Sequence, residues 1–320
     1  MSPPFDDTPA LIGIEIGGTK TQVVVGAPDG GILDRRRFLV DRAAGAKGIL
    51  SDIASAVDGY FATAKIEAIG IAFGGPVDRL SGKTVRSHQI DGWDDFFLAQ
   101  WASRRWKVPV SLENDANTAA FAESQFGAGV GSPSMFYTTL GSGVGGGMVI
   151  GNAIFHGALA SETEIGHLTL PQSGDTVESL CSGWAVNKRL RTCASEQPNS
   201  WLARHIDQFP GAEARILSDP AARQDANCQA VIADVSQTLA WAFSVVSALL
   251  SPARIVIGGG LSHLGDSFRD EIDGRLQGLL MDALRPGPQL CLATLGEDVV
   301  PIGALALAQK ALDSISSQEP

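Results

Sequence analysis

Three polar residues that can bind a ligand or accept a proton follow a short apolar segment in the first half of the chain. Residues 108–112 read VPVSL, which is typical of a strand, and residues 113–118 read ENDANT. The letters that follow predict a helix. Asp115 at the helix N-terminus could act as a general base, since the helix dipole favours its ionised form. Taken alone, Asp115 could equally be a helix cap, because Asp is a preferred capping residue.

Two glycine-rich turns offer backbone N–H groups that could bind phosphate. Residues 17–21 read GGTKT, and residues 141–147 read GSGVGGG. Glycines bare the backbone N–H groups, and a side-chain hydroxyl adds a donor to the cradle that they form. For each turn alone, a tight hairpin is at least as good an interpretation, because glycine supplies positive φ there.

Neither turn fits a familiar nucleotide-binding motif. Gly141, Gly143 and Gly146 satisfy G-x-G-x-x-G, but the MVIG that follows predicts a strand where a dinucleotide fold needs a helix. In the first turn, Thr19 stands where a P-loop has the glycine before its lysine, and a strand is again expected next.

The two turns belong to segments of the same form, which indicates a duplication. Residues 11–26 and 136–151 each read strand, glycine turn, strand. Each is followed by a predicted helix and then an apolar strand. In the first half, the helix is indicated by apolar residues at four-residue spacing, namely Ile49, Ile53, Val57 and Phe61. The sequence therefore predicts two similar α/β domains.

The expected organisation is a flexible tail followed by two domains. We expect residues 1–10 to form the tail, residues 11–115 an N-terminal domain and residues 116–303 a C-terminal domain. The last helix, within residues 304–320, is expected to return to the first domain.

Composition excludes several classes of protein. The 320 residues carry a net charge of −11 and are 44% hydrophobic. An acidic chain has no favourable long-range field toward nucleic acid or an anionic membrane surface. The longest apolar stretch, near residues 241–250, falls short of the ~20 residues of a membrane span. The four cysteines lack C-x-x-C spacing, which favours reduced thiols in a cytoplasm, each a small core residue.

Six segments together resemble the ROK family of sugar kinases and sugar-responsive repressors. In chain order they are IEIGGTK, GIAFGGPVD, LENDANTAAFAE, TLGSGVGGGMVIG, ETEIGH and IVIGGGLS, between residue 11 and about residue 310. The resemblance implies an α/β fold of two similar actin-like (ribonuclease H-like) domains with an ATP and sugar cleft between them. It also implies a homodimer.

The resemblance further implies phosphorylation of a hexose hydroxyl, of glucose or a close relative, with Mg²⁺ and ATP. It places the general base at Asp115. The implied sugar contacts are Gly75, Gln89, Asn114, Asp115, Glu164, His167 and Glu178. The implied nucleotide contacts are Gly17, Gly18, Thr19, Lys20, Thr139, Gly141, Ser142, Gly143, Gly258, Gly259 and Gly260.

Other roles for some of these residues stay open. His167 could be a packing histidine, Glu164 an exposed acid, and Lys20 part of a solvated face. Glu113 matches no family role, and we expect a surface acid or a hinge contact. Trp184 could fill core space.

The chain departs from the family pattern at three places. Glu15 stands where the usual first loop has aspartate, which could shift the Mg²⁺ site slightly. Residues 168–178 contain none of the cysteines that hold a structural zinc in many members, so no zinc is expected. Gln89 stands where many glucose-type members have asparagine, which leaves the sugar open.

Two further functions remain as alternatives. One is a kinase for an N-acetylated hexosamine. The other is a sugar-binding regulator without kinase activity, although repressors of the family carry ~80 more residues ahead of the first phosphate loop, and the acidic charge does not suit DNA.

Overall fold

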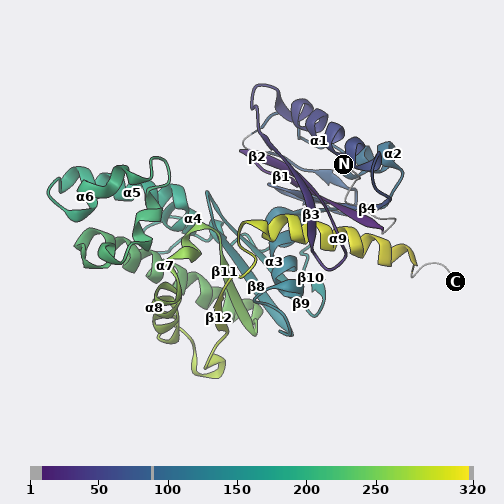
Figure 1. Ribbon diagram of the computed structural model, residues 1–320. Helices are drawn as coiled ribbons and strands as arrows, with labels where there is room; N and C mark the ends of the chain where they lie inside the picture. Colours follow the sequence, from purple (N-terminus) through teal and green to yellow (C-terminus); the bar gives the residue numbers. More distant parts are fainter. Residues whose placement is uncertain (1–8, 88–89, 317–320) are drawn as a thin grey trace. The chain divides into compact units, whose positions relative to one another are not determined.

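The chain divides into two compact units, each with its own hydrophobic core. Figure 1 shows the computed structural model, which describes residues 9–87 and 90–316. Unit 1 comprises Met1–Gly127, Asn152–Glu162 and Glu297–Pro320, and unit 2 comprises Ala128–Gly151 and Thr163–Gly296. Residues 1–8 of the expected tail, and Gln89, lie outside the described residues. The expected domain boundary near Asp115 stays a prediction, because a compact unit need not be a unit of folding.

The sheet of unit 1 combines a hairpin with two parallel strands. The strand order is β3-β2-β1-β4-β7. Strand β1 is antiparallel to β2 and parallel to β4, which is parallel to β7. The bounds are β1 Ala10–Ile16, β2 Lys20–Gly26, β3 Ile32–Leu39, β4 Ile66–Phe73 and β7 Val110–Asn114. A separate hairpin pairs β5 (Val77–Asp78) with β6 (Lys83–Thr84).

The second sheet repeats this order. It runs β10-β9-β8-β11-β12, with β8 antiparallel to β9 and parallel to β11, which is parallel to β12. The bounds are β8 Ser134–Leu140, β9 Val144–Ile150, β10 Ala153–Ile154, β11 Arg254–Gly258 and β12 Gln289–Leu292. The shared order confirms the predicted α/β class with two similar halves.

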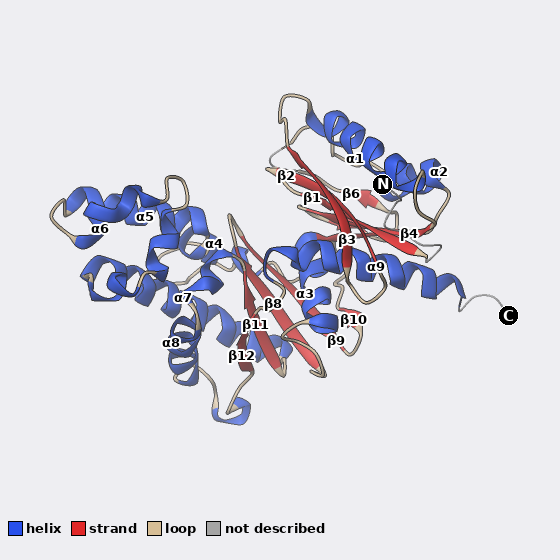
Figure 2. Ribbon diagram, viewed as in Figure 1, coloured by secondary structure: helices blue, strands red, loops and turns tan. Residues whose placement is uncertain are grey.

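Helices accompany both sheets, as Figure 2 shows. Unit 1 contains α1 (Gly45–Phe61), α2 (Leu98–Trp106), α3 (Asp115–Phe126) and α9 (Val299–Ser316). Unit 2 contains α4 (Val177–Cys181), α5 (Gly183–Glu196), α6 (Trp201–His205), α7 (Ala226–Leu250) and α8 (Asp266–Gln277). The short 3-10 helices of unit 2 include η1 (Ile165–His167) and η5 (Gly260–Leu264).

Strands β1, β2 and β4 of the first sheet are buried on both faces, because their alternate residues pack against different helices. Ile12 and Val23 belong to the same core cluster as Ile49 and Ile53 of α1. Leu11 and Val24 instead pack with Leu305 and Ala308 of α9. Burial on both faces explains why these strands read as continuous apolar runs.

Helix α9 approaches the first sheet closely at positions where glycine is required. A methyl group added at Gly70 of β4 would overlap the backbone carbonyl of Ala304. One added at Gly13 of β1 would lie 2.9 Å from the carbonyl oxygen of Pro301. The two glycines therefore let the helix backbone lie against the strand backbones.

Helix α7 is the central helix of the second core. It is long and apolar enough to cross a membrane by length and composition, but 61% of its most apolar window is buried inside the protein. Val231, Leu239 and Phe243 are fully buried in the core of unit 2. Its hydropathy is thus that of a core helix.

The cysteines divide into two kinds. Cys181 and Cys228 are buried, and Cys193 and Cys291 are half-buried; all four are free thiols. Burial raises the pKa of the Cys181 thiol to about 12. The expectation that every cysteine is a core residue therefore holds for Cys181 and Cys228 but not fully for the other two.

We predict that Gly70→Ala lowers the free energy of unfolding by about 1–3 kcal/mol or more, because the added methyl group meets backbone that cannot rotate away. The control is Gly274→Ala in α8, where a methyl group meets no atom within 4 Å. That change should stabilise the protein by up to about 1 kcal/mol. Urea unfolding of both variants measures the difference, and equal effects would contradict the close approach of α9.

A second prediction concerns Asp225, the N-cap of α7. Its carboxylate accepts hydrogen bonds from the backbone N–H groups of Asn227, Cys228 and Leu202, at 2.9, 3.1 and 3.1 Å. Burial alone would raise the pKa of this carboxyl, but these donors outweigh it and lower the pKa. Asp225→Ala should cost about 1–2 kcal/mol of unfolding free energy at neutral pH.

The pH dependence of that cost follows from the lowered pKa. The ionised Asp225 stabilises the fold above its unfolded pKa of about 3.9, and this contribution is lost as the pH falls through the lower folded pKa. The stability gap between wild type and Asp225→Asn should therefore shrink below about pH 4. Urea unfolding from pH 7 to pH 3 tests this, and a gap independent of pH would contradict it.

Candidate active site

In unit 1, three of the predicted site segments meet at one edge of the sheet. The parallel strands β1, β4 and β7 end in register, since Ile16 pairs with Phe73 and Phe73 with Asn114. The residues after these strand ends are Gly17–Thr19, Gly74–Gly75 and Asp115. Ligands of α/β sheets bind at the carboxyl ends of parallel strands. This edge is the natural position for a site.

The first glycine turn is the turn of a hairpin. The Gly17 N–H donates to the carbonyl of Lys20 at 3.0 Å, and β2 follows at once. The turn is thus not a P-loop, as the sequence predicts. Thr19, at the tip of the turn, is exposed. A strand-turn-strand cradle with an exposed hydroxyl has the chemistry of a phosphate site.

Glu15, the first departure from the family pattern, is held by neighbouring side chains. Gln22 donates a hydrogen bond to its carboxylate, and Lys20 Nζ lies 3.8 Å from Glu15 Oε1. The side-chain oxygen Oε1 of Gln22 in turn accepts from Arg37 Nε at 3.1 Å. The longer side chain is therefore fixed in place by a chain of polar contacts along β1, β2 and β3.

The helix that begins within ENDANT, α3, is capped by Asn114. Its Oδ1 accepts from the backbone N–H groups of Ala116 at 2.9 Å and Asn117 at 3.2 Å. Its Nδ2 donates to the carbonyl of Gly75 at 3.1 Å. The cap interpretation of Asp115 is therefore wrong, because the residue before it already satisfies these N–H groups.

Asp115 is the first residue of α3 and lies beside the glycine loops. Its Oδ1 accepts from the Ala116 N–H at 2.8 Å. A methyl group added at Gly74 would lie 3.5 Å from Asp115 Oδ2 and 3.6 Å from Gly17 Cα. The structure thus brings Asp115 together with the first phosphate turn and the Gly74–Gly75 loop.

Glu113 is buried, with 4% of its surface exposed, so the expectation of a surface acid is wrong. Its Oε1 accepts from the Asn114 N–H at 2.9 Å and from Asn117 Nδ2 at 3.2 Å, and its Oε2 lies 2.7 Å from His156 Nε2. Sequence reasoning missed His156 and Asn117. His156 is 43 positions away, and no local spacing links the two.

In unit 2, the second glycine turn and the predicted adenosine loop also meet at a sheet edge. Gly258 of β11 pairs with Thr139 of β8. The turn after β8 contains Gly141, Ser142 and Gly143, and the Gly141 N–H donates to the Gly143 carbonyl at 3.0 Å. The N–H of Gly183, at the start of α5, donates to the Gly141 carbonyl at 2.7 Å.

The glycines after β11 have a packing reason as well as a predicted binding role. Gly259 has φ +79°, and a methyl group there would lie 2.5 Å from backbone atoms of Leu140. One added at Gly258 would overlap the Tyr137 side chain, whereas Gly260 is open apart from the Leu140 carbonyl oxygen at 3.9 Å. Only Gly260 is therefore without a packing constraint from these neighbours.

The predicted sugar residues of unit 2 lie on two short helices that contact each other, η1 and α4. Glu164 directly precedes η1, and His167 is its last residue. Both are exposed, so His167 is not a packing histidine. Glu178 lies in α4, where its Oε2 accepts from the Val144 N–H at 2.9 Å. Glu178 is therefore bound to the end of the second glycine turn.

The cysteine-free stretch between His167 and Glu178 is a compact turn. The Leu170 N–H donates to the Asp175 carbonyl at 2.8 Å, and the Val177 N–H to the Leu168 carbonyl at 3.0 Å. Thr176 then starts α4 with a capping box. Backbone hydrogen bonds thus hold this turn in shape.

Trp184 lies in the first turn of α5, next to Gly183, and 57% of its surface is exposed. The expectation that it fills core space is wrong. Its exposure was hidden from sequence reasoning, because an apolar residue at a helix start gives no sign of which way it points.

Comparison with known proteins covers nearly the whole chain. The profile of the ROK family matches residues 11–311. A glucokinase of Halalkalibacterium halodurans is 31% identical over 306 residues, which are 91% of this chain and 92% of that protein. The crystal structure of a ROK family glucokinase from Streptomyces griseus in complex with glucose and AMPPNP has a TM-score of 0.80 and 29% identity, covering 94% of this chain and 99% of that chain.

A regulator has the same fold. A ROK family transcriptional regulator, a homolog of the E. coli MLC protein, has a TM-score of 0.85 at 19% identity, covering 95% of this chain and 78% of that chain. At that identity the likeness shows the two-domain actin-like fold alone. The family match over residues 11–311 and the glucokinase relative establish that this chain belongs to the ROK family.

Proposed function

We propose that this ROK family sugar kinase transfers the γ-phosphoryl group of ATP to a hydroxyl of glucose or a closely related hexose, with Asp115 as general base. The observation that supports this most is the meeting of Asp115, the first glycine turn and the Gly74–Gly75 loop at the carboxyl ends of β1, β4 and β7. A proton acceptor beside a phosphate cradle is what phosphoryl transfer to a hydroxyl requires.

The base needs only moderate strength. Phosphoryl transfer has a loose transition state, so the main tasks are to align the hydroxyl and to balance the charge on the phosphoryl oxygens. Asp115 holds one carboxylate oxygen on the Ala116 N–H, which fixes the orientation of the group. In our proposal Oδ2, on the side of Gly74, accepts the proton of the sugar hydroxyl.

Asn114 has one amide hydrogen left for the sugar. Its Oδ1 accepts two backbone N–H groups, and one hydrogen of Nδ2 is given to the Gly75 carbonyl. An asparagine amide has two donor hydrogens. We assign the second one to a hydroxyl of the hexose, next to the one that reacts.

Unit 2 supplies the other contacts in this proposal. Glu178 keeps one oxygen on the Val144 N–H and uses the other to accept from a sugar hydroxyl, with Glu164 and His167 as further ligands. The Thr139 hydroxyl and the N–H groups of Ser142 and Gly143 in the second glycine turn suit phosphate, and open Gly260 suits the adenosine side. Mg²⁺ bound with ATP would neutralise phosphate charge, and Glu15, in β1 just before the first glycine turn, could help to place it.

The identity of the sugar rests on the relatives. The Halalkalibacterium relative is a glucokinase, and the Streptomyces griseus structure contains glucose and AMPPNP. A kinase for an N-acetylated hexosamine and a regulator without kinase activity remain the alternatives. A homodimer and a cytoplasmic location stay predictions.

We predict that Asp115→Asn lowers kcat by about 10²–10⁴-fold, the usual contribution of a positioned general base. A coupled assay of ADP release measures it, with Asp52→Asn as control, since Asp52 is exposed on α1. The control should keep wild-type activity. Turnover that survives in Asp115→Asn would show that another group accepts the proton.

The same assay with different sugars decides between the functions. Wild-type protein is tested with glucose, fructose, mannose, N-acetylglucosamine and N-acetylmannosamine, and with ATP or polyphosphate as donor. We expect the highest kcat/KM with glucose and ATP. Preference for an N-acetylated sugar selects the first alternative, and no turnover with any pair selects the regulator.

Asn114 and Asp115 should differ in their effect on stability. Asn114→Ala removes the cap of α3 and should lower the free energy of unfolding by about 1–2 kcal/mol. Asp115→Asn keeps the cap, and we expect a change within about 0.5 kcal/mol. Urea unfolding compares the two variants, and an equal loss in both would contradict Asn114 as the cap.

A further inference from the structure

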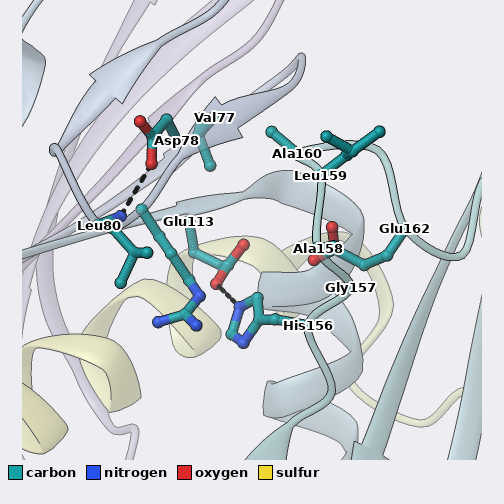
Figure 3. A pocket seen from close by; sticks show the side chains of 11 residues that line it. Val77, Asp78, Leu80, Glu113, His156, Gly157, Ala158, Leu159, Ala160 and Glu162 are labelled. Carbon is teal, nitrogen blue, oxygen red and sulfur yellow. Dashed lines mark hydrogen bonds and ion pairs between the residues drawn. The ribbon is translucent and has the colours of Figure 1, made fainter.

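A second cluster of polar residues lies in unit 1 outside the proposed catalytic residues. It consists of Glu113 at the end of β7, Asn117 in α3, and His156 and Glu162 in the segment after β10. Figure 3 shows His156 turned toward Glu113, with Glu162 nearby at the same small cavity. Ligand atoms of Glu113, His156 and Glu162 all lie within 4.8 Å of one another.

The cluster brings two carboxylates against one amide. Asn117 Nδ2 donates to Glu113 Oε1 at 3.2 Å and to Glu162 Oε1 at 3.1 Å. Two carboxylates this close repel each other unless a positive charge or shared donors balance them. A cation between the carboxylates would remove the repulsion directly.

The buried amide of Asn117 provides an independent observation. Only 3% of Asn117 is exposed, and its Oδ1 has no hydrogen-bond partner although it is buried. The two ends of an asparagine amide are assigned from their hydrogen bonds. The opposite orientation would aim Oδ1 at both carboxylates, which is favourable only with a cation between them. In that orientation a metal ion between the carboxylates would also bind Oδ1, and Nδ2 would take the buried position that has no partner.

The cavity beside the cluster has the size for an ion and not for a sugar. Its volume is about 80 Å³, and its lining includes Glu113, His156, Glu162, Arg79 and residues 157–160. Small-molecule pockets are typically about 300 Å³ or more. A water takes about 30 Å³ of liquid volume, so an ion and one or two waters fit.

We propose that Glu113, His156, Glu162 and Asn117 bind a divalent transition-metal ion such as Zn²⁺, Mn²⁺ or Co²⁺. An imidazole nitrogen with carboxylate oxygens suits these ions, whereas Mg²⁺ and Ca²⁺ prefer oxygen ligands alone. Metal–ligand distances of about 2.0–2.2 Å place ligand atoms about 3.3–3.6 Å apart at tetrahedral angles, and about 4.4 Å apart only when two ligands lie opposite each other, so the side chains would close in by about 1 Å on binding.

The site would brace the segment that carries the proposed base. Glu113 also accepts the N–H of Asn114, the cap of α3, at 2.9 Å. An ion on Glu113 and His156 therefore ties residues 152–162 to the end of β7 and the first turn of α3. The earlier expectation of no zinc rests on residues 168–178, which belong to unit 2, and does not concern this cluster.

The experiment is titration of the full, tag-free, metal-stripped protein with Co²⁺ in the absence of nucleotide. We expect a visible d–d absorption band that saturates at one ion per chain, and displacement of Co²⁺ by Zn²⁺ but not by Mg²⁺. Glu162→Gln and His156→Gln should each weaken Co²⁺ binding by more than the roughly 10–100-fold caused by loss of an outer-shell partner.

Matched controls keep the result specific. Glu196→Gln and His263→Gln change exposed residues of unit 2 and should leave Co²⁺ affinity unchanged. Asp115→Asn and Glu15→Gln should also leave it unchanged, which separates this ion from one bound at the catalytic edge. Circular dichroism checks that the metal-free variants are folded, and if His156→Gln does not fold, Glu162→Gln alone decides.

Three results would overturn the proposal. The first is no Co²⁺ binding to the folded wild type. The second is binding that persists in folded Glu162→Gln, and the third is binding that is lost with Asp115→Asn or Glu15→Gln. The first would leave Glu113 and His156 as a hydrogen-bonded pair. None of these readouts depends on kinase activity, so failure here leaves the proposed function standing.

Discussion

The side chain of Asn114 is the interaction on which the unit 1 site depends. Its side-chain oxygen caps α3, and its amide nitrogen donates to the Gly75 carbonyl, so one side chain links the start of α3 and the end of β7 to the loop after β4. Because Asn114 satisfies the first N–H groups of the helix, Asp115 is spared that task. Its carboxylate stays at the positive end of the helix dipole, where a negative charge is favoured.

The close contact of α9 with the first sheet also holds the strands that lead to this edge. Gly13 and Gly70 let the helix lie against the backbones of β1 and β4, the two strands that lead into the first glycine turn and the Gly74–Gly75 loop. Backbone packed against backbone has few soft torsions, so the loops start from rigid strand ends. Binding sites built on such rigid elements are positioned more accurately than sites on free loops.

Sequence reasoning predicted the features that depend on local pattern. The duplicated hairpins, the amphipathic face of α1 and the strands ending at ENDANT all follow from periodicity and turn residues. The predicted exposure of Glu113 and the predicted burial of Trp184 were wrong, because the exposure of a side chain depends on residues that are distant in the sequence. Glu113 is buried next to His156, which lies 43 positions away in the sequence. The capping role also went to the wrong residue, since Asn and Asp are almost equally good caps and a shift of one position decides between them.

The regulator with the same fold shows why the function has to be argued from single residues. A sugar-binding regulator needs hydroxyl ligands, the role that we propose for Glu164 and His167, but it has no need for a carboxylate at a helix N-terminus beside the proposed phosphate turn. Asp115 is not used as the cap, and its Oδ2 faces Gly74 at the sheet edge. The helix dipole favours an acid at this position, but the helix does not need that acid as a cap. The proposed catalytic role therefore explains the presence of Asp115, which folding alone does not.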